Sequence, residues 1–124
     1  MQPAIGRIRA RGSARSGAAA WKAMRYTSVA LLFLTVWFVF TAVAMAGASY
    51  LEWAAWFRSP LNAGLMVLLV VTAFYHAKLG VQEVIEDYVH TESTKVAAVV
   101  ALNFVAALLA TTCIVAILML ATGV

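Results

Sequence analysis

Hydrophobic residues fill three long runs of this chain, and the charged residues stand almost entirely between them. The runs that lack Asp, Glu, Lys and Arg are residues 26–51, 59–77 and 96–124. At ~1.5 Å of rise per residue, a helix over each run is long enough to cross a hydrocarbon core of ~30 Å. The pattern therefore predicts an all-α membrane protein with three transmembrane helices, at about 21–47, 60–89 and 95–121.

The segments between these helices carry boundary signals. Ser59 followed by Pro60 is typical of an N-cap and a first helical residue, so the second helix is expected to begin there. The preceding segment, 48–60, is expected to be an external loop. Its Tyr50, Trp53 and Trp56 would form an aromatic belt at the membrane surface, where amphipathic rings prefer to lie.

The charge distribution predicts the orientation. Six of the nine basic residues precede the first uncharged run, 26–51, and no acidic residue occurs before Glu52. This asymmetry follows the positive-inside rule and indicates a cytoplasmic N-terminus. Residues 1–20, rich in Ala, Gly, Ser and Arg, are expected to form a basic N-terminal arm, extended or poorly ordered in isolation, ahead of a membrane anchor at 21–124. We favour this interpretation over a nucleic-acid-binding arm and expect no nucleic-acid partner.

Two targeting interpretations stay open beside this one. The basic start, the apolar run and "AMAG" at 44–47 resemble a secretory signal with its cleavage site, although the apolar run is long for a signal and two further spans follow. The Arg-rich, acid-free beginning also resembles a mitochondrial transit peptide in composition.

Candidate chemistry is concentrated in "YHAKLGVQEVIEDYVH", residues 75–90. On a helix, His76 shares one face with Gly80, Glu83 and Asp87. If the hydrocarbon core ends near residue 82, His76 lies inside the membrane, ~9 Å from the boundary. An ionisable side chain at such a depth is a functional candidate.

Two interpretations of His76 are open from the residues alone. It is either a packing residue hydrogen-bonded to a neighbouring helix or the axial ligand of a haem, for which the missing side chain of Gly80 leaves a flat space one turn away. His90 is ~21 Å further along the helix axis and cannot bind the same iron. With no C-x-x-C-H motif in the chain, a bis-histidine haem would be non-covalent and take its second ligand from another chain.

Asp87 and Tyr88 are a second candidate pair. A phenol beside a carboxylate at the membrane surface can hydrogen-bond a carbonyl oxygen and help to move protons, or it can be an ordinary interfacial tyrosine next to a solvated acid. The remaining acids are interpreted as solvated or as partner contacts: Glu83, Glu86 and Glu92.

The stretch "HAKLGVQEVIEDYV" resembles the H-x-x-x-G-x-x-x-(V/I)-(I/L)-x-D-Y-V signature of the smaller hydrophobic anchor of succinate dehydrogenase, respiratory complex II. All seven fixed positions match, from His76 to Val89. The preceding "GSARSGAAAWKAMRYTSVALL", with its Arg25-Tyr26-Thr27 motif, is also similar to that family. The resemblance covers essentially the whole chain.

The resemblance implies a non-catalytic subunit of a succinate:quinone oxidoreductase. His76 would be an axial ligand of a haem b, with Gly80 beside it, and the other ligand would come from a second anchor subunit of the cytochrome b556 type. Arg25 would lie near a haem propionate or the quinone pocket. Tyr88 would hydrogen-bond a ubiquinone carbonyl, with Asp87 next to it.

The implied partners are an iron–sulfur subunit, a flavoprotein subunit and membrane lipid. The implied location is a bacterial inner membrane, with a mitochondrial inner membrane as the second choice. Two other functions stay open: an anchor of a fumarate reductase, and a small non-redox membrane helper or transporter in which His76 only packs.

Overall fold

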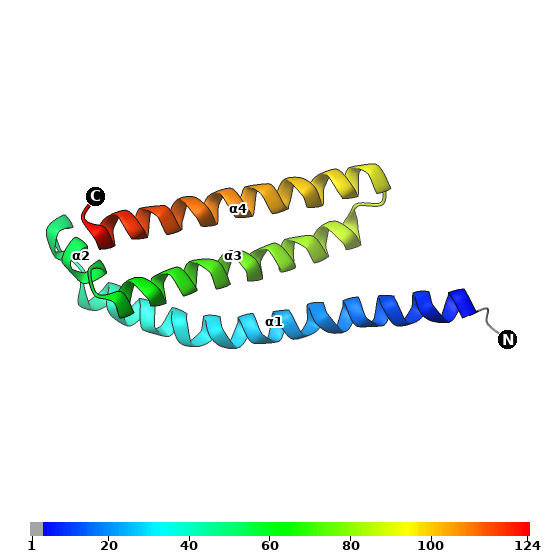
Figure 1. Ribbon diagram of the computed structural model, residues 1–124, viewed down its shortest axis with the longest axis horizontal. Helices are drawn as coiled ribbons and strands as arrows, with labels where there is room; N and C mark the ends of the chain where they lie inside the picture. The colour runs from blue at the N-terminus through cyan, green and yellow to red at the C-terminus, as the bar shows by residue number, and fades with distance from the viewer. Residues whose placement is uncertain (1–3) are drawn as a thin grey trace.

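The computed structural model describes the backbone of residues 4–124 and the side chains of residues 17–124. Its helices are α1 (Ala4–Ala44), α2 (Tyr50–Phe57), α3 (Pro60–Tyr88) and α4 (Glu92–Thr122) (Figure 1). In the part of the chain searched, α1, α3 and α4 each contain a stretch long and apolar enough to cross a membrane. The chain is thus an all-α membrane protein, as the hydrophobic pattern predicts.

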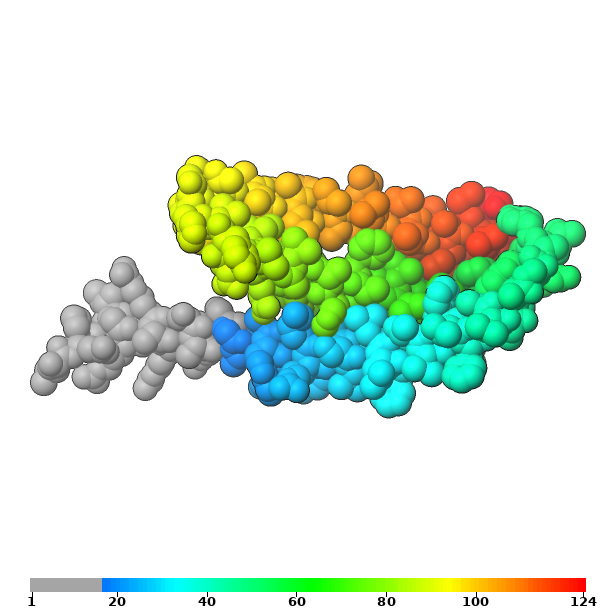
Figure 2. Space-filling model, turned by 180° about the vertical axis from the view of Figure 1, so that it is seen from behind, coloured from blue at the N-terminus to red at the C-terminus, as the bar shows by residue number. Residues whose placement is uncertain are grey.

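The three long helices form a flat layer with α3 in the middle. Helix α3 contacts both α1 and α4, and within the described residues α1 and α4 do not contact each other. The view from behind shows the same order (Figure 2). The N-terminal part of α1 and the α3–α4 turn lie at one end of the layer, whereas α2 and the C-terminus lie at the other (Figure 1). Residues of α3 can therefore face α1, α4 or either open side of the layer.

The bounds of α3 and α4 agree with the prediction within a few residues, but the start of α1 does not. The structure continues α1 back to Ala4, where an extended arm over residues 1–20 and a helix start near Trp21 were expected. The correction has a physical reason, because Ala and Arg, which dominate this segment, are among the strongest helix formers. Residues 1–3 lie outside the described part of the chain.

Helix α2 replaces most of the predicted external loop. Its N-cap is Ser49, whose hydroxyl oxygen accepts a hydrogen bond from the Glu52 N–H at 3.3 Å, while a Glu52 carboxylate oxygen accepts from the Ser49 N–H at 3.3 Å. This reciprocal pair is a capping box, and its S-x-x-E pattern is visible in the sequence. The expectation of a loop overlooked that signal.

The aromatic residues at this end of the layer pack against one another and against α1. The Trp37 ring on α1 stacks on the Trp56 ring at 5.7 Å between centroids, and Phe57 meets Trp56 edge-on at 4.9 Å. Phe57 is buried, Trp53 and Trp56 are half-buried, and Tyr50 is exposed. Trp56 therefore joins α2 to α1, and the aromatic belt at the membrane surface stays a prediction.

Two glycines provide a test of this backbone. Gly47 follows α1 with φ +81°, whereas Gly64 lies inside α3 with open space at its Cβ position among the described side chains. We expect Gly47→Ala to lower the free energy of unfolding by about 1–2 kcal/mol, because an L side chain is strained at that φ. Gly64→Ala should raise it by about 0.5–1 kcal/mol. Unfolding in detergent, followed by tryptophan fluorescence, measures the free energy of unfolding of both variants. A Gly47→Ala variant more stable than the unsubstituted protein would contradict the positive φ at Gly47.

Candidate functional site

His76 lies in the middle of α3 and is held by α1. Its Nδ1 is 2.8 Å from the hydroxyl oxygen of Thr27. The two helices run in opposite directions (Figure 1). Thr27 lies ~25 Å from the end of α1 at Ala44, and His76 lies about the same distance from the start of α3 at Pro60. The contact therefore joins residues at the same depth in the layer.

Thr27 is itself fixed by its own helix. Its hydroxyl is 2.7 Å from the carbonyl oxygen of Ala23 and 3.2 Å from that of Met24. A threonine inside a helix commonly donates its hydroxyl hydrogen to such a carbonyl one turn back. Both Thr27 and His76 are half-buried within this chain.

Gly80 provides open space one turn beyond His76. A Cβ added at Gly80 would meet no side chain of the described part of the chain within 4 Å. Because residues four apart lie on nearly the same helix face, this space adjoins the imidazole. The predicted pairing of His76 with a gap at Gly80 is thus present in the geometry, while the occupant of the gap stays a prediction.

Arg25 is two residues from Thr27 and points about 200° away from it around α1. Its guanidinium lies over the Trp21 ring, 4.9 Å from the centroid, as in a cation–π contact. These two residues line a groove of ≈ 460 Å³ together with Lys22 and Tyr26. The structure therefore places the cations of Lys22 and Arg25 on the outer surface of α1, at the depth of the α3 turn that follows His76. It does not bring Arg25 into the contact between α1 and α3.

Asp87 and Tyr88 end α3 at the same end of the layer as the N-terminal part of α1 (Figure 1). Both are exposed, and Tyr88 is 77% exposed. Tyr88 is twelve residues beyond His76, or ~18 Å along the axis. The structure thus separates this pair from the imidazole by about three helical turns, as the sequence spacing requires, and leaves its phenol open to a partner.

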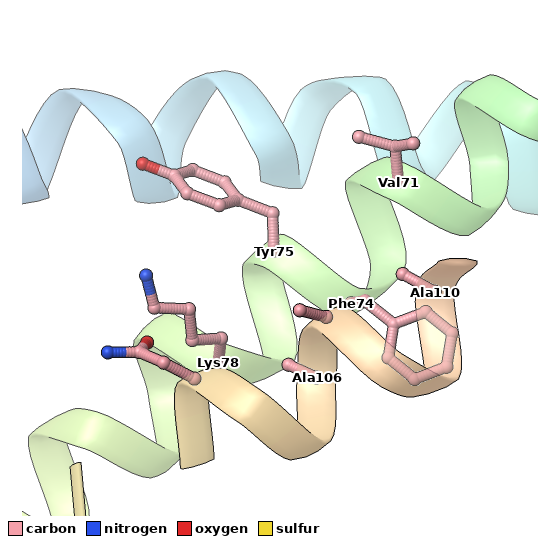
Figure 3. A pocket seen from close by; sticks show the side chains of 8 residues that line it. Val71, Phe74, Tyr75, Lys78, Ala106 and Ala110 are labelled. Atoms are coloured by element: carbon pink, nitrogen blue, oxygen red, sulfur yellow. The ribbon is translucent and has the colours of Figure 1, made fainter. Parts of the chain in front are cut away.

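Lys78 lies on a different face of α3 from His76. It lines a groove of ≈ 290 Å³ between α3 and α4, in which Lys78 and Asn103 are the polar side chains beside Tyr75 (Figure 3). Its ammonium nitrogen is 5.7 Å from the centroid of the Tyr75 ring. Lys78 is therefore not part of the His76 site.

The side chains of residues 17–124 contain no group of three or more His, Cys, Asp and Glu that could hold a metal ion. A single axial histidine needs no such cluster, because the porphyrin supplies the in-plane ligands of a haem iron. His76 is therefore compatible with a haem iron without further metal ligands from this part of the chain.

The sequence interpretation missed the contact of Thr27 with His76. The sequence indicates Thr27 only as part of the Arg25-Tyr26-Thr27 motif. A usable signal existed, because two antiparallel helices of known ends bring residues of equal depth together, and Thr27 is a hydroxyl residue at the depth of His76.

The comparisons with known proteins agree with this architecture. Residues 1–110 match the family described as "Succinate dehydrogenase/Fumarate reductase transmembrane subunit". The chain belongs to this family. Its three long apolar helices are those of a transmembrane subunit, and its smaller-anchor motif lies on α3, the middle helix.

Two curated relatives show the same relationship. The succinate dehydrogenase hydrophobic membrane anchor subunit of Rickettsia bellii (strain RML369-C) is 34% identical over 80 residues, which cover 63% of this chain and 62% of the relative. The subunit of the same description from Rickettsia conorii (strain ATCC VR-613 / Malish 7) is 33% identical over 79 residues, covering 63% of each chain. The match thus spans less than two thirds of the length of these relatives.

Proposed function

We propose that this member of the succinate dehydrogenase/fumarate reductase transmembrane family is the smaller membrane anchor of a succinate dehydrogenase. It binds a haem b through His76, shares that haem with a second anchor subunit, and borders a ubiquinone site with Tyr88 and Asp87. It also docks an iron–sulfur subunit, which receives electrons from a flavoprotein subunit. The N-terminus and the α3–α4 turn face the cytoplasm of a bacterial cell.

The observation that carries the proposal is His76 itself: an imidazole in the middle of an apolar span, bonded at Nδ1 and next to the open space at Gly80. These residues fit a planar, iron-bearing ring, because the bonded ring nitrogen fixes the imidazole and leaves the other nitrogen for the metal. A b-type haem at this place supplies a one-electron carrier within the membrane.

The remaining residues have separate tasks in this proposal. The cations of Lys22 and Arg25 lie at the depth of the turn that follows His76 and are suited to bind carboxylates, such as haem propionates, or to line the quinone pocket. Tyr88 donates a hydrogen bond to a quinone carbonyl, and Asp87 beside it accepts and passes protons from the aqueous side. Quinone reduction consumes protons as well as electrons, so a site at the membrane surface is appropriate.

Succinate oxidation is favoured over fumarate reduction by the descriptions of the Rickettsia relatives, which are succinate dehydrogenase subunits. The family description includes fumarate reductase, so the reverse reaction is the second candidate. The descriptions give no support to a non-redox helper or transporter.

A substitution in the open space tests the haem site without touching the ligand. We expect Gly80→Leu to lower the haem content of the purified complex by more than half, because the new side chain occupies the space next to the imidazole. Gly64→Leu is the matched control, since Gly64 also lies inside α3 with open space at its Cβ position among the described side chains. The haem content per amount of protein is measured by pyridine haemochrome assay. If Gly80→Leu retains as much haem as Gly64→Leu, the haem does not lie next to Gly80.

A further inference from the structure

The hydrogen bond between Thr27 and His76 connects two helices across 49 residues of sequence. It is a side chain–side chain contact between spans, whereas the other threonine hydroxyl bonds described for the spans, such as that of Thr41 to the Trp37 carbonyl at 2.9 Å, stay within one helix. A contact of this kind at the candidate haem ligand points to a task beyond local helix packing.

The bonds of Thr27 indicate which imidazole nitrogen carries the hydrogen. A hydroxyl has one hydrogen to donate, and a carbonyl oxygen can only accept. The 2.7 Å contact with the Ala23 carbonyl therefore uses the hydroxyl hydrogen. Towards His76 the Thr27 oxygen then acts as an acceptor at 2.8 Å, and the Nδ1–H donates.

This assignment leaves the Nε2 of His76 without a hydrogen. A neutral imidazole has one N–H and one lone pair, so a hydrogen on Nδ1 places the lone pair on Nε2, where a metal can bind. The opposite arrangement, in which the Thr27 hydroxyl donates to Nδ1, would place the hydrogen on Nε2 and block coordination. The hydrogen bond to the Ala23 carbonyl favours the first arrangement.

We propose that Thr27 is a positioning residue for the haem ligand, an inference that rests on the proposed haem function of His76. Its hydroxyl oxygen accepts the Nδ1–H, fixes the ring orientation and the tautomer, and makes the coordinating Nε2 more basic. Outer partners of metal-bound histidines act in this way and typically alter metal affinity by 10–100-fold when removed. A more basic ligand stabilises ferric haem relative to ferrous haem, so Thr27 lowers the haem midpoint potential.

The experiment compares three variants in the purified, assembled complex. Thr27→Val keeps the side-chain volume and removes the acceptor, Thr27→Ser keeps the hydroxyl, and Thr41→Val removes an equivalent threonine hydroxyl of α1 that bonds only to its own helix. Haem content, the midpoint potential from a redox titration of the b-type band, and the low-spin ferric EPR g-values are measured for each.

We expect Thr27→Val to lower the haem content of the complex. It should also reduce the preference for ferric over ferrous haem by up to about tenfold. For a one-electron couple this change equals a rise of about 59 mV in midpoint potential. The g-values should shift as the ring orientation is released. Thr27→Ser and Thr41→Val should remain close to the unsubstituted protein in all three measurements.

The outcomes separate this inference from the proposed function. An unsubstituted complex without a b-type band would remove the haem function and the role of Thr27 together. A normal band in the unsubstituted complex, with Thr27→Val unchanged in haem content, potential and g-values, would overturn the role of Thr27 alone. Equal shifts in Thr27→Ser, or in Thr41→Val, would also overturn it, because they would indicate general disturbance of α1.

Discussion

Replacing His76 by alanine is expected to abolish the b-type absorbance of the assembled complex. The substitution removes the only imidazole that lies within a span of the described chain, and His90 stands beyond the end of α3, ~21 Å along the axis from His76. A haem held by the partner's ligand alone would lose one of its two axial bonds. Reduced-minus-oxidised spectra of the purified complex measure the effect.

The control for this prediction is His90→Ala, which removes the other histidine of the chain from the exposed α3–α4 turn and should leave the band at full height. The Thr27 contact gives the His76→Ala substitution a structural side effect, because the Thr27 hydroxyl loses its imidazole partner. Assembly of the complex is therefore checked by subunit composition. A fully assembled His76→Ala complex with an unaltered b-type spectrum would refute the assignment of the ligand.

Replacing Tyr88 by phenylalanine is expected to lower succinate:ubiquinone reductase activity by about 100-fold, the lower end of the range for a positioned proton donor. The change removes one oxygen from a ring that is 77% exposed, so it disturbs little packing within the described part of the chain. Succinate oxidation with an artificial dye as acceptor should be unaffected, because that reaction does not use the quinone site.

Tyr50→Phe is the matched control for the Tyr88 substitution. Tyr50 is 72% exposed and stands at the opposite end of the layer, on α2 (Figure 1), so both activities should persist in that variant. If Tyr88→Phe lowers the dye and quinone activities equally, the ring has a structural task rather than a place in the quinone site.

The sequence predicts the spans well because membrane insertion constrains composition strongly. A helix that crosses lipid must be apolar over about twenty residues, so the interruptions by Glu52, Arg58 and Lys78 bound the runs. The Ser59-Pro60 boundary is confirmed, with Ser59 at the N-cap of α3 and Pro60 at its start. Local signals outside the spans were harder to interpret, as α2 and the early start of α1 show.

The candidate site could be predicted only as far as it lies on one helix. The spacing of His76 and Gly80 fixes their common face whatever the tertiary structure is. The contact with Thr27 also depends on which helices are neighbours, which a motif does not contain, although the helix ends place Thr27 near the depth of His76. The position of Arg25 has the same limit: its motif does not show that its side chain lies over Trp21 on the outer surface of α1, and its place near a haem propionate or the quinone pocket stays a prediction.

The proposed function depends on the imidazole of His76, which binds haem iron at the boundary with a second subunit. The most direct measurement is a cryo-electron microscopy map of the purified complex at a resolution that shows side chains. We expect His76 Nε2 at ~2 Å from a haem iron, with Nδ1 bonded to Thr27 and the second axial ligand supplied by another chain. A map in which the His76 ring faces lipid or another side chain, with no porphyrin against Gly80, would contradict it.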